Sequence, residues 1–178
     1  MKRCLAIFAL VMLGVFSMPG ASAQQPPTSE KSAMQTQETA RATLAGGCFW
    51  CLESDLERVE GVHSVVSGYT GGQEQYPSYE QVAGGRTGHY EAVQVHFDPK
   101  VVDFAAILDV FWRHIDPTDD GGQFVDRGSQ YRSEIFYHND TQKRLAEASK
   151  AALEKSMVFE KPVVTPVTRF EIFYPAEK

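Results

Sequence analysis

Two cysteines three residues apart, Cys48 and Cys51, are the residues of this sequence best suited to chemistry. A pair with this spacing is a redox couple, half of a metal site, or two cysteines that only fill a core. The setting fits the last reading poorly, because Gly46-Gly47 precede the pair and Phe49-Trp50 lie between its members. A tetrahedral zinc site would need two further ligands. The five histidines form no second close pair and are scattered over the chain at His63, His89, His96, His114 and His138, so we expect no metal.

The sequence around Cys48 predicts a nucleophile. A short strand over residues 42–45 and a Gly-Gly turn lead into a helix expected from about Cys48 to Glu60. Unpaired backbone N–H groups and the positive end of the helix dipole favour negative charge at a helix start. They therefore favour the thiolate of Cys48, which is the reactive form. Cys51 lies one turn later on the same face, within reach of a disulfide if the first turn loosens slightly.

The elements that must position these cysteines follow from the hydrophobic pattern. After the first strand and helix we expect strands and helices over the following ranges: strands over 62–67, 89–97, 133–137 and 163–174, the last interrupted by Pro166, and helices over 103–114 and 141–156. This order predicts an α+β fold, a two-layer sandwich with a ferredoxin-like βαββαβ core. Two long loops, 68–88 and 116–131, remain. Because loops of more than about 12 to 15 residues are usually functional or disordered, we expect them to build the active site together.

The first residues predict export. Lys2 and Arg3 precede a short apolar run over 5–13, and Ala21-Ser22-Ala23 is a typical cleavage site. We therefore expect an export signal over 1–23, a flexible polar leader over 24–40 and one catalytic domain over 41–178. An uncleaved anchor and a lipoprotein are the alternatives, but Cys4 lies before the apolar run, where a lipid-modified cysteine would not be. The mature protein is expected to be periplasmic or secreted.

Charge narrows the possible partners. Loss of residues 1–23 leaves 155 residues with 15 basic and 23 acidic side chains, a formal charge of −8. The acidic balance and the lack of any basic run argue against nucleic acid and against an anionic membrane surface. We expect a monomer that is not attached to a membrane after signal cleavage and that acts on a soluble substrate or protein partner.

Several segments resemble one enzyme family in the same order. The segment 46–53, Gly-Gly-Cys-Phe-Trp-Cys-Leu-Glu, is similar to the active-site segment of the A class of peptide methionine sulfoxide reductases. Further similar segments cover nearly the whole domain: 68–72, 76–82, 85–93, 97–99, 116–118 and 126–133. The resemblance implies repair of oxidised methionine, with the S epimer at sulfur as the substrate of this class.

The resemblance also implies roles for individual residues. Cys48 matches the nucleophile, whose thiolate attacks the sulfoxide sulfur, becomes a sulfenic acid and releases methionine. Glu91 matches the acid that protonates the departing oxygen. It lies on an otherwise apolar strand, where partial burial would keep it protonated. Without the resemblance, the pattern favours an ordinary glutamate on the solvent side of that strand.

Five further residues match the substrate pocket of the family. Tyr79 and Tyr131 match two hydroxyl donors to the sulfoxide oxygen. Phe49 and Trp50 match the pocket for the substrate methyl group, where sulfur-bound groups contact aromatic faces. Asp126 matches an acidic residue that binds or orients the substrate.

Two departures from the family pattern affect recycling and specificity. Many relatives have glycine at the position of Cys51 and place their recycling cysteines near the C-terminus, yet no cysteine follows Cys51 here. We therefore expect Cys51 to resolve the sulfenic acid as a disulfide. The alternative is that an external thiol reduces the sulfenic acid directly. The electrons then come from an external dithiol reductant, a thioredoxin-like donor, and no metal or organic cofactor is needed. Phe124 and Val125 differ from the commoner form, which affects pocket shape and peptide preference.

Two functions of other classes stay open from the sequence. The first is a general dithiol-disulfide oxidoreductase, because a Cys-x-x-Cys pair at a helix start is also the thioredoxin arrangement. In that arrangement, however, the aromatic residue precedes the first cysteine. The second is a non-catalytic module that binds oxidised or apolar peptides through its aromatic residues.

Overall fold

The structure, a computed structural model, describes residues 39–177. The expected export signal, and all but the last two residues of the expected leader, lie outside the described residues. The helices and strands are, in chain order, β1 (Ala40–Ala45), α1 (Phe49–Leu56), β2 (Val62–Thr70), α2 (Tyr79–Ala83), β3 (Tyr90–Phe97), α3 (Phe104–His114), β4 (Gly122–Gln123), β5 (Asp126–Arg127), the 3-10 helix η1 (Ser129–Tyr131), β6 (Glu134–Tyr137), α4 (Asp140–Lys155), β7 (Val167–Arg169) and β8 (Phe173–Pro175).

One sheet organises this part of the chain. Its strand order is β7-β6-β1-β3-β2-β8, and its central four strands, β6-β1-β3-β2, are mutually antiparallel. With α1 and α3 as connections, these four strands form the βαββαβ core, so the predicted α+β fold is confirmed. The predicted last strand is two short strands instead. β7 pairs parallel to β6 at one edge and β8 pairs antiparallel to β2 at the other.

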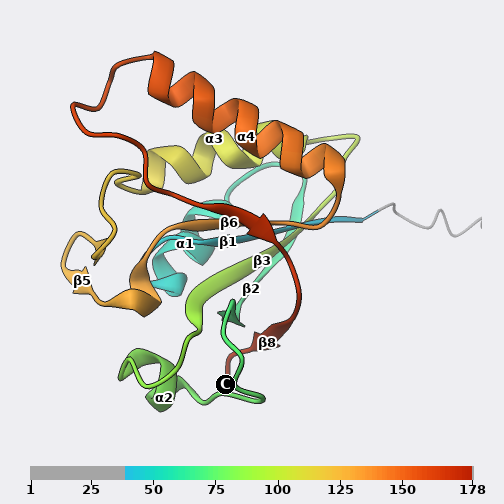
Figure 1. Cartoon of the computed structure of the whole chain (residues 1–178). Helices are drawn as coiled ribbons and strands as arrows, with labels where there is room; N and C mark the ends of the chain where they lie inside the picture. The colour runs from blue at the N-terminus through green and yellow to red at the C-terminus, as the bar shows by residue number, and fades with distance from the viewer. Residues whose placement is uncertain (1–38, 178) are drawn as a thin grey trace, which may run out of the picture. The chain divides into compact units, whose positions relative to one another are not determined.

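The helix α3 packs against both α1 and α4, and all three helices contact the sheet. Figure 1 shows α3 and α4 side by side. Asp103 caps α3 by accepting a hydrogen bond from the Ala106 N–H at 2.8 Å, a favourable start for a helix. Its apolar face, with Ile107, Leu108 and Phe111 fully buried, joins the main hydrophobic cluster. A smaller cluster around Ala45, Ala92 and Phe136 is separate from it. The two clusters give the sheet an apolar environment along β1 and β3.

The strand β3 is more buried than its sequence suggests. Residues 91–95 are all buried in succession, although the pattern predicts one apolar and one solvent-facing side. The cause is that both faces of β3 are covered. Val93 and Val95 on one face join the main cluster, and Ala92 on the other face joins the smaller one. Its polar residues Glu91 and Gln94 are 2% and 8% exposed. Gln94 donates a hydrogen bond to the Thr43 hydroxyl at 3.3 Å. A buried carboxyl group must have partners or lose its charge, so Glu91 requires a separate explanation.

The two long loops contain more regular structure than expected. The first three residues of the predicted loop 68–88 extend β2, and α2 forms inside the loop. Ser78 and Gln81 form a capping box at the start of α2, in which each side chain bonds the backbone N–H of the other residue. The predicted loop 116–131 contains the β4–β5 hairpin and η1. Such short elements leave little hydrophobic periodicity to detect.

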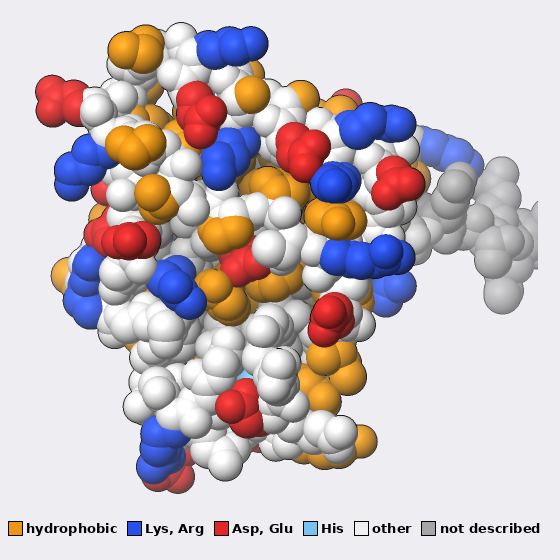
Figure 2. Space-filling model, in the orientation of Figure 1, with side chains coloured by type: hydrophobic (Ala, Val, Ile, Leu, Met, Phe, Trp, Pro, Cys, Tyr) orange, Lys and Arg blue, Asp and Glu red, His pale blue; other side chains and the backbone are white. Residues whose placement is uncertain are grey.

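The surface drawn in Figure 2 carries both signs of charge. Lysine, arginine, aspartate and glutamate side chains are interspersed on this face, with no continuous basic region. None of the helices within residues 39–177 is long and apolar enough to cross a membrane.

Candidate active site

The turn before α1 sets the position of Cys48. Gly47 has φ +85°, a left-handed conformation that favours glycine, and a Cβ at this position would lie 2.9 Å from the Cβ of Gln123. The Gly47 N–H donates to the Tyr131 carbonyl at 3.2 Å, which ties the turn to η1. Cys48 is the N-cap of α1, and its side chain makes no capping hydrogen bond. The half-buried thiol is therefore left available for chemistry at the predicted helix start.

Cys51 lies one turn into α1, which ends at Leu56 rather than near Glu60. Its N–H donates to the Cys48 carbonyl at 3.1 Å, and both cysteines are free thiols. Partial burial, together with the charge of Cys48 and a hydrogen bond to its side chain, raises the pKa of the exposed Cys51 thiol. Cys51 therefore keeps its proton beside the Cys48 sulfur, and the two sulfurs are close enough to interact.

Glu91 lies inside the molecule at the start of α1. One carboxyl oxygen, Oε2, accepts a hydrogen bond from the Phe49 N–H at 3.2 Å, one residue from Cys48. Burial raises the pKa of Glu91 to about 7, against the lowering effect of the Phe49 N–H, and the charge of Asp126 raises it further. The alternative of a solvent-facing glutamate is therefore excluded. Near neutral pH this carboxyl group has a proton to give.

Aromatic rings form one wall beside Cys48. The ring of Phe49 lies 5.2 Å from that of Trp50 and 6.1 Å from that of Tyr79, measured between centroids. The Trp50 and Tyr79 rings are 5.6 Å apart. These three residues line a cavity of about 450 Å³ together with Tyr69, with Ser78 and Glu80 at the start of α2, and with residues 176–177. Trp50 is 58% exposed, so the cavity is open to solvent on one side.

Tyr79 is held by its backbone at the first position of α2. Its N–H donates to the two carboxylate oxygens of Glu177 at 3.0 and 3.2 Å. The Tyr69 hydroxyl donates to the same carboxylate at 3.0 Å, so Glu177 joins β2, α2 and the end of the sheet. Burial, followed by the charges of Glu91 and Cys48, raises the pKa of the Tyr79 hydroxyl. Tyr79 therefore stays a hydrogen-bond donor in this site.

Tyr131 and Asp126 approach the same site from the second long loop. Burial and the charge of Glu91 raise the pKa of Tyr131, and the charges of Tyr79 and Asp126 add to this effect. Asp126 follows the tip of the β4–β5 hairpin, which a bidentate ion pair of Arg127 with Asp119, at 2.6 and 3.0 Å, holds in place. The structure thus brings all eight predicted site residues to one region.

Two residues of this region were missed by the sequence analysis. Glu177 follows the last strand in a short polar end, where nothing marks it as different from a solvated glutamate. Gln123 is 1% exposed, and its side-chain amide bonds both the N–H and the carbonyl of Asp116 at 2.7 and 3.0 Å. Their partners are distant in sequence or lie across a turn, so only the folded chain reveals them.

The described part of the chain contains no set of side chains that could hold a metal ion. Within residues 39–177 no three histidine, cysteine or acidic side chains are grouped as a metal ion would need.

Comparisons with known proteins decide the family. The sequence model of the peptide methionine sulfoxide reductases matches residues 40–178. The MsrA protein of Bacillus velezensis is 54% identical over 136 residues, 76% of this chain and 77% of that protein. The chain belongs to the peptide methionine sulfoxide reductase family. Within the family it is similar to the A class, as its active-site segment implies.

Other relatives support the same family assignment for this reductase. MsrA of Listeria monocytogenes is 51% identical over 82% of each chain. The MsrA/MsrB protein of Vibrio cholerae is 48% identical over 99% of this chain, which spans 47% of that longer protein. Identity at this level over most of the chain shows a peptide-methionine (S)-S-oxide reductase, an oxidoreductase that uses thiols to reduce methionine S-sulfoxide.

Solved structures of the family share the fold of this reductase. The reduced form of Mxr1 from Saccharomyces cerevisiae has a TM-score of 0.74 at 31% identity, covering 79% of this chain and 81% of that chain. The methionine sulfoxide reductase A of Corynebacterium diphtheriae has a TM-score of 0.66 at 27% identity, covering 81% of this chain and 72% of that chain. Mxr1 in complex with Trx2 has a TM-score of 0.59 at 23% identity, covering 83% of this chain and 88% of that chain. At this identity the likeness supports the fold alone.

The raised pKa of Glu91 predicts a pH dependence of stability. The unfolded carboxyl group ionises near pH 4.5 and the folded one near 7, so the folded state binds more protons between these values. This contribution to the unfolding free energy is fully present below about pH 4.5 and is lost as the pH rises through about 7. We expect the wild type to lose up to about 3 kcal/mol over this window relative to Glu91→Gln, as measured by urea denaturation at each pH. Parallel curves for the two proteins would show that Glu91 is ionised in the folded state.

Proposed function

We propose that Cys48 is the nucleophile of this reductase and that Glu91 is its acid. The observation that carries this assignment is the hydrogen bond from the Phe49 N–H to the buried Glu91 carboxyl. It places a proton donor at the same helix start as the sulfur that attacks. A raised carboxyl pKa near the working pH is what general-acid catalysis requires.

The first step transfers oxygen from the substrate to the enzyme. The Cys48 thiolate attacks the sulfoxide sulfur, and its electron pair forms the new S–S contact while the S–O bond weakens. The oxygen gains negative charge and takes the proton of Glu91. The hydroxide that leaves the substrate sulfur then bonds to the Cys48 sulfur while the S–S bond breaks and its electron pair goes to the substrate sulfur. Methionine leaves, and Cys48 is left as the sulfenic acid. Methionine sulfoxide has been reduced by two electrons and Cys48 has been oxidised by two.

The other pocket residues orient the substrate in this proposal. The Tyr79 and Tyr131 hydroxyls donate hydrogen bonds to the sulfoxide oxygen, whose charge grows in the transition state. The faces of Phe49 and Trp50 receive the methyl group. The Asp126 carboxylate binds or orients the substrate backbone. Its charge also raises the pKa of Glu91 and so helps keep the acid protonated.

The second stage restores the thiols. The Cys51 sulfur attacks the sulfur of the Cys48 sulfenic acid, forming a disulfide and releasing the oxygen as water. An external dithiol then reduces this disulfide and becomes oxidised itself. We propose a thioredoxin-like protein as the donor, because Cys51 is exposed and because the chain offers no later cysteine. No further cofactor is required by this balance.

The site of action follows from the N-terminal sequence. We propose that residues 1–23 are an export signal, that residues 24–40 are a polar leader and that the mature reductase is a periplasmic or secreted monomer. The support is the charged start, the short apolar run and the Ala-Ser-Ala cleavage site. An oxidising compartment also makes an external supply of electrons necessary.

The substrate assignment is tested with separate S and R epimers of a blocked methionine sulfoxide and dithiothreitol as reductant. We expect the chain from Gln24 to release methionine from the S epimer alone, because one pocket orients the methyl group and the oxygen. Chromatography of the products measures the methionine released from each epimer. Reduction of insulin disulfides without any methionine release would instead identify a general dithiol oxidoreductase.

If Cys51 resolves the sulfenic acid, its loss should leave the first turnover intact but slow repeated turnover. Cys51→Ser should still release about one methionine per enzyme without added reductant, because Cys48 and Glu91 are intact. With a thioredoxin system its steady-state rate should fall at least roughly tenfold, since no disulfide forms for the donor to reduce. Rapid-quench and steady-state assays measure the two quantities.

Cys48→Ser is the matched control for this experiment, because the same atom change at the nucleophile should abolish the first turnover as well. A full steady-state rate of Cys51→Ser with the thioredoxin system would remove Cys51 from the mechanism.

A further inference from the structure

A second cavity adjoins the aromatic pocket. It has a volume of about 640 Å³ and lies between the segment 75–78, which precedes α2, and the segment 172–175, which contains β8. It shares Ser78 and Glu177 with the pocket beside Cys48. The larger cavity takes no part in the mechanism above. We call it the flanking groove. The shared residues place it directly beside the pocket, as a single extended ligand would require.

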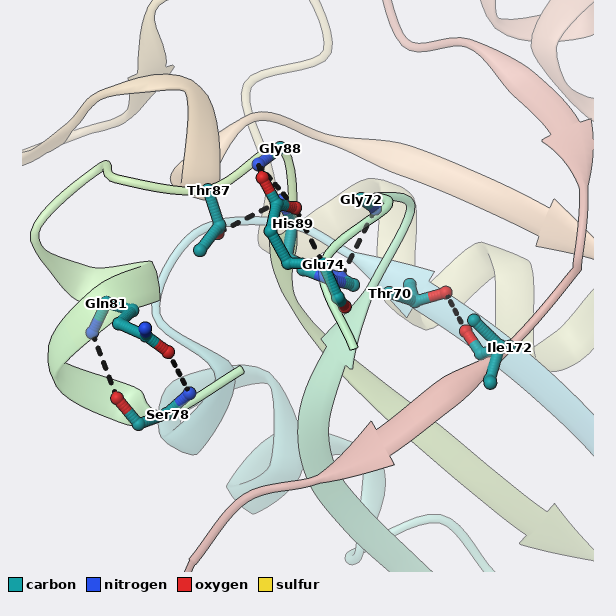
Figure 3. A network of polar contacts seen from close by, with 9 residues as sticks. All are labelled: Thr70, Gly72, Glu74, Ser78, Gln81, Thr87, Gly88, His89 and Ile172. Atoms are coloured by element: carbon teal, nitrogen blue, oxygen red, sulfur yellow. Dashed lines mark hydrogen bonds and ion pairs between the residues drawn. The ribbon is translucent and has the colours of Figure 1, made fainter. Parts of the chain in front are cut away.

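Hydrogen bonds hold the chain next to each wall of the flanking groove (Figure 3). The buried His89 ring contacts the Glu74 carbonyl at 2.8 Å and accepts a hydrogen bond from the Gly72 N–H at 3.2 Å, which holds the loop that leads to α2. On the other side the Thr70 hydroxyl donates to the Ile172 carbonyl at 2.5 Å. A preformed groove loses little conformational entropy when it binds a ligand.

Tyr76 presents an exposed ring at this groove. Its side chain is 84% exposed, and its ring packs edge-on against that of Tyr174 with centroids 5.5 Å apart. The backbone of Tyr76 has φ 51°, a left-handed conformation that is unfavourable for a large side chain. Strain of this kind persists where the surroundings enforce it and is concentrated at binding sites. The fold thus holds an aromatic side chain in solvent at a conformational cost.

The lining of the groove favours an apolar, extended ligand. Its one charged residue is Glu177, whose carboxylate is engaged by the Tyr79 N–H and the Tyr69 hydroxyl. No cation is present among the lining residues to receive an acidic side chain. β8 is the last strand of the sheet, and no described strand pairs with its outer side. Such an edge can receive an extended peptide through main-chain hydrogen bonds.

We propose that the flanking groove binds the part of an oxidised protein next to its methionine sulfoxide, with an apolar and preferably aromatic side chain against Tyr76. This proposal rests on the proposed function, because it takes the sulfoxide to lie in the pocket beside Cys48. It makes the reductase selective for extended, apolar segments over the free amino acid. Aromatic pairs and apolar burial supply the preference.

Short blocked peptides with one methionine S-sulfoxide test the proposal. Each carries Phe, Gly or Asp at one neighbouring position, in two series that vary the residue before or after the sulfoxide. We expect kcat/KM to be about five- to twentyfold higher for Phe than for Gly in one series, and lower for Asp than for Gly. In Tyr76→Asn the Phe preference should fall to about twofold or less, while kcat/KM for blocked methionine sulfoxide alone changes by less than about twofold.

Met157→Asn is the matched control. Met157 is also a left-handed non-glycine residue, with φ 55° and 81% exposure, but it lines a different cavity after α4. It should keep the wild-type preference. An equal loss on the blocked amino acid and the peptides in Tyr76→Asn, or no preference for Phe in either series, would overturn the proposal.

Calorimetry with Cys48→Ser separates this result from the proposed function. The Phe and Gly sulfoxide peptides should differ in Kd by about the same five- to twentyfold factor without any turnover. Wild-type enzyme that fails to reduce blocked methionine sulfoxide would contradict the proposed function, whereas equal Kd values for the two peptides would contradict the groove.

Discussion

The hydrogen bond between the Phe49 N–H and the Glu91 carboxyl is the contact on which the site depends. It joins the first turn of α1 to the central strand β3, so the sulfur of Cys48 and the acid have a fixed relation. The bond by itself would favour an ionised Glu91, yet burial is the larger effect and raises its pKa to about 7. The acid therefore has both the position and the proton that the reaction needs.

The surrounding structure supports this contact from several directions. Gly47 lets the chain turn tightly against Gln123 and binds the backbone of Tyr131, which brings the second long loop to the nucleophile. Glu177 holds the first residue of α2, and with it Tyr79, against the end of the sheet. These anchors come from segments far apart in the sequence. The walls of the pocket are therefore tied to one another by hydrogen bonds between distant segments.

The sequence predicts the core well because the patterns that mark its helices and strands lie within short stretches of the chain. Apolar periodicity and N-cap residues mark α3 and α4, and the order of the elements is enough to predict the central four strands. The resemblance of short motifs selects the residues around Cys48. The resemblance does not show which of these residues are buried. Glu91 appears on an alternating strand and proves to lie beneath the first turn of α1, because the packing of that helix on β3 joins segments far apart in the sequence. The short helix α2 and the anchor Glu177 depend on distant partners in the same way.

The central claim is that the Glu91 carboxyl group, beside the thiol of Cys48, still binds a proton near neutral pH because its pKa is raised to about 7. Its titration can be followed directly from the side-chain carboxyl carbon in the NMR spectrum of ¹³C-labelled enzyme, with Glu91→Gln used to assign the signal. A midpoint near pH 7 is the result expected from the buried carboxyl group. A midpoint near 4.5, the ordinary value for glutamate, would mean that the carboxylate is ionised at work and that another group supplies the proton.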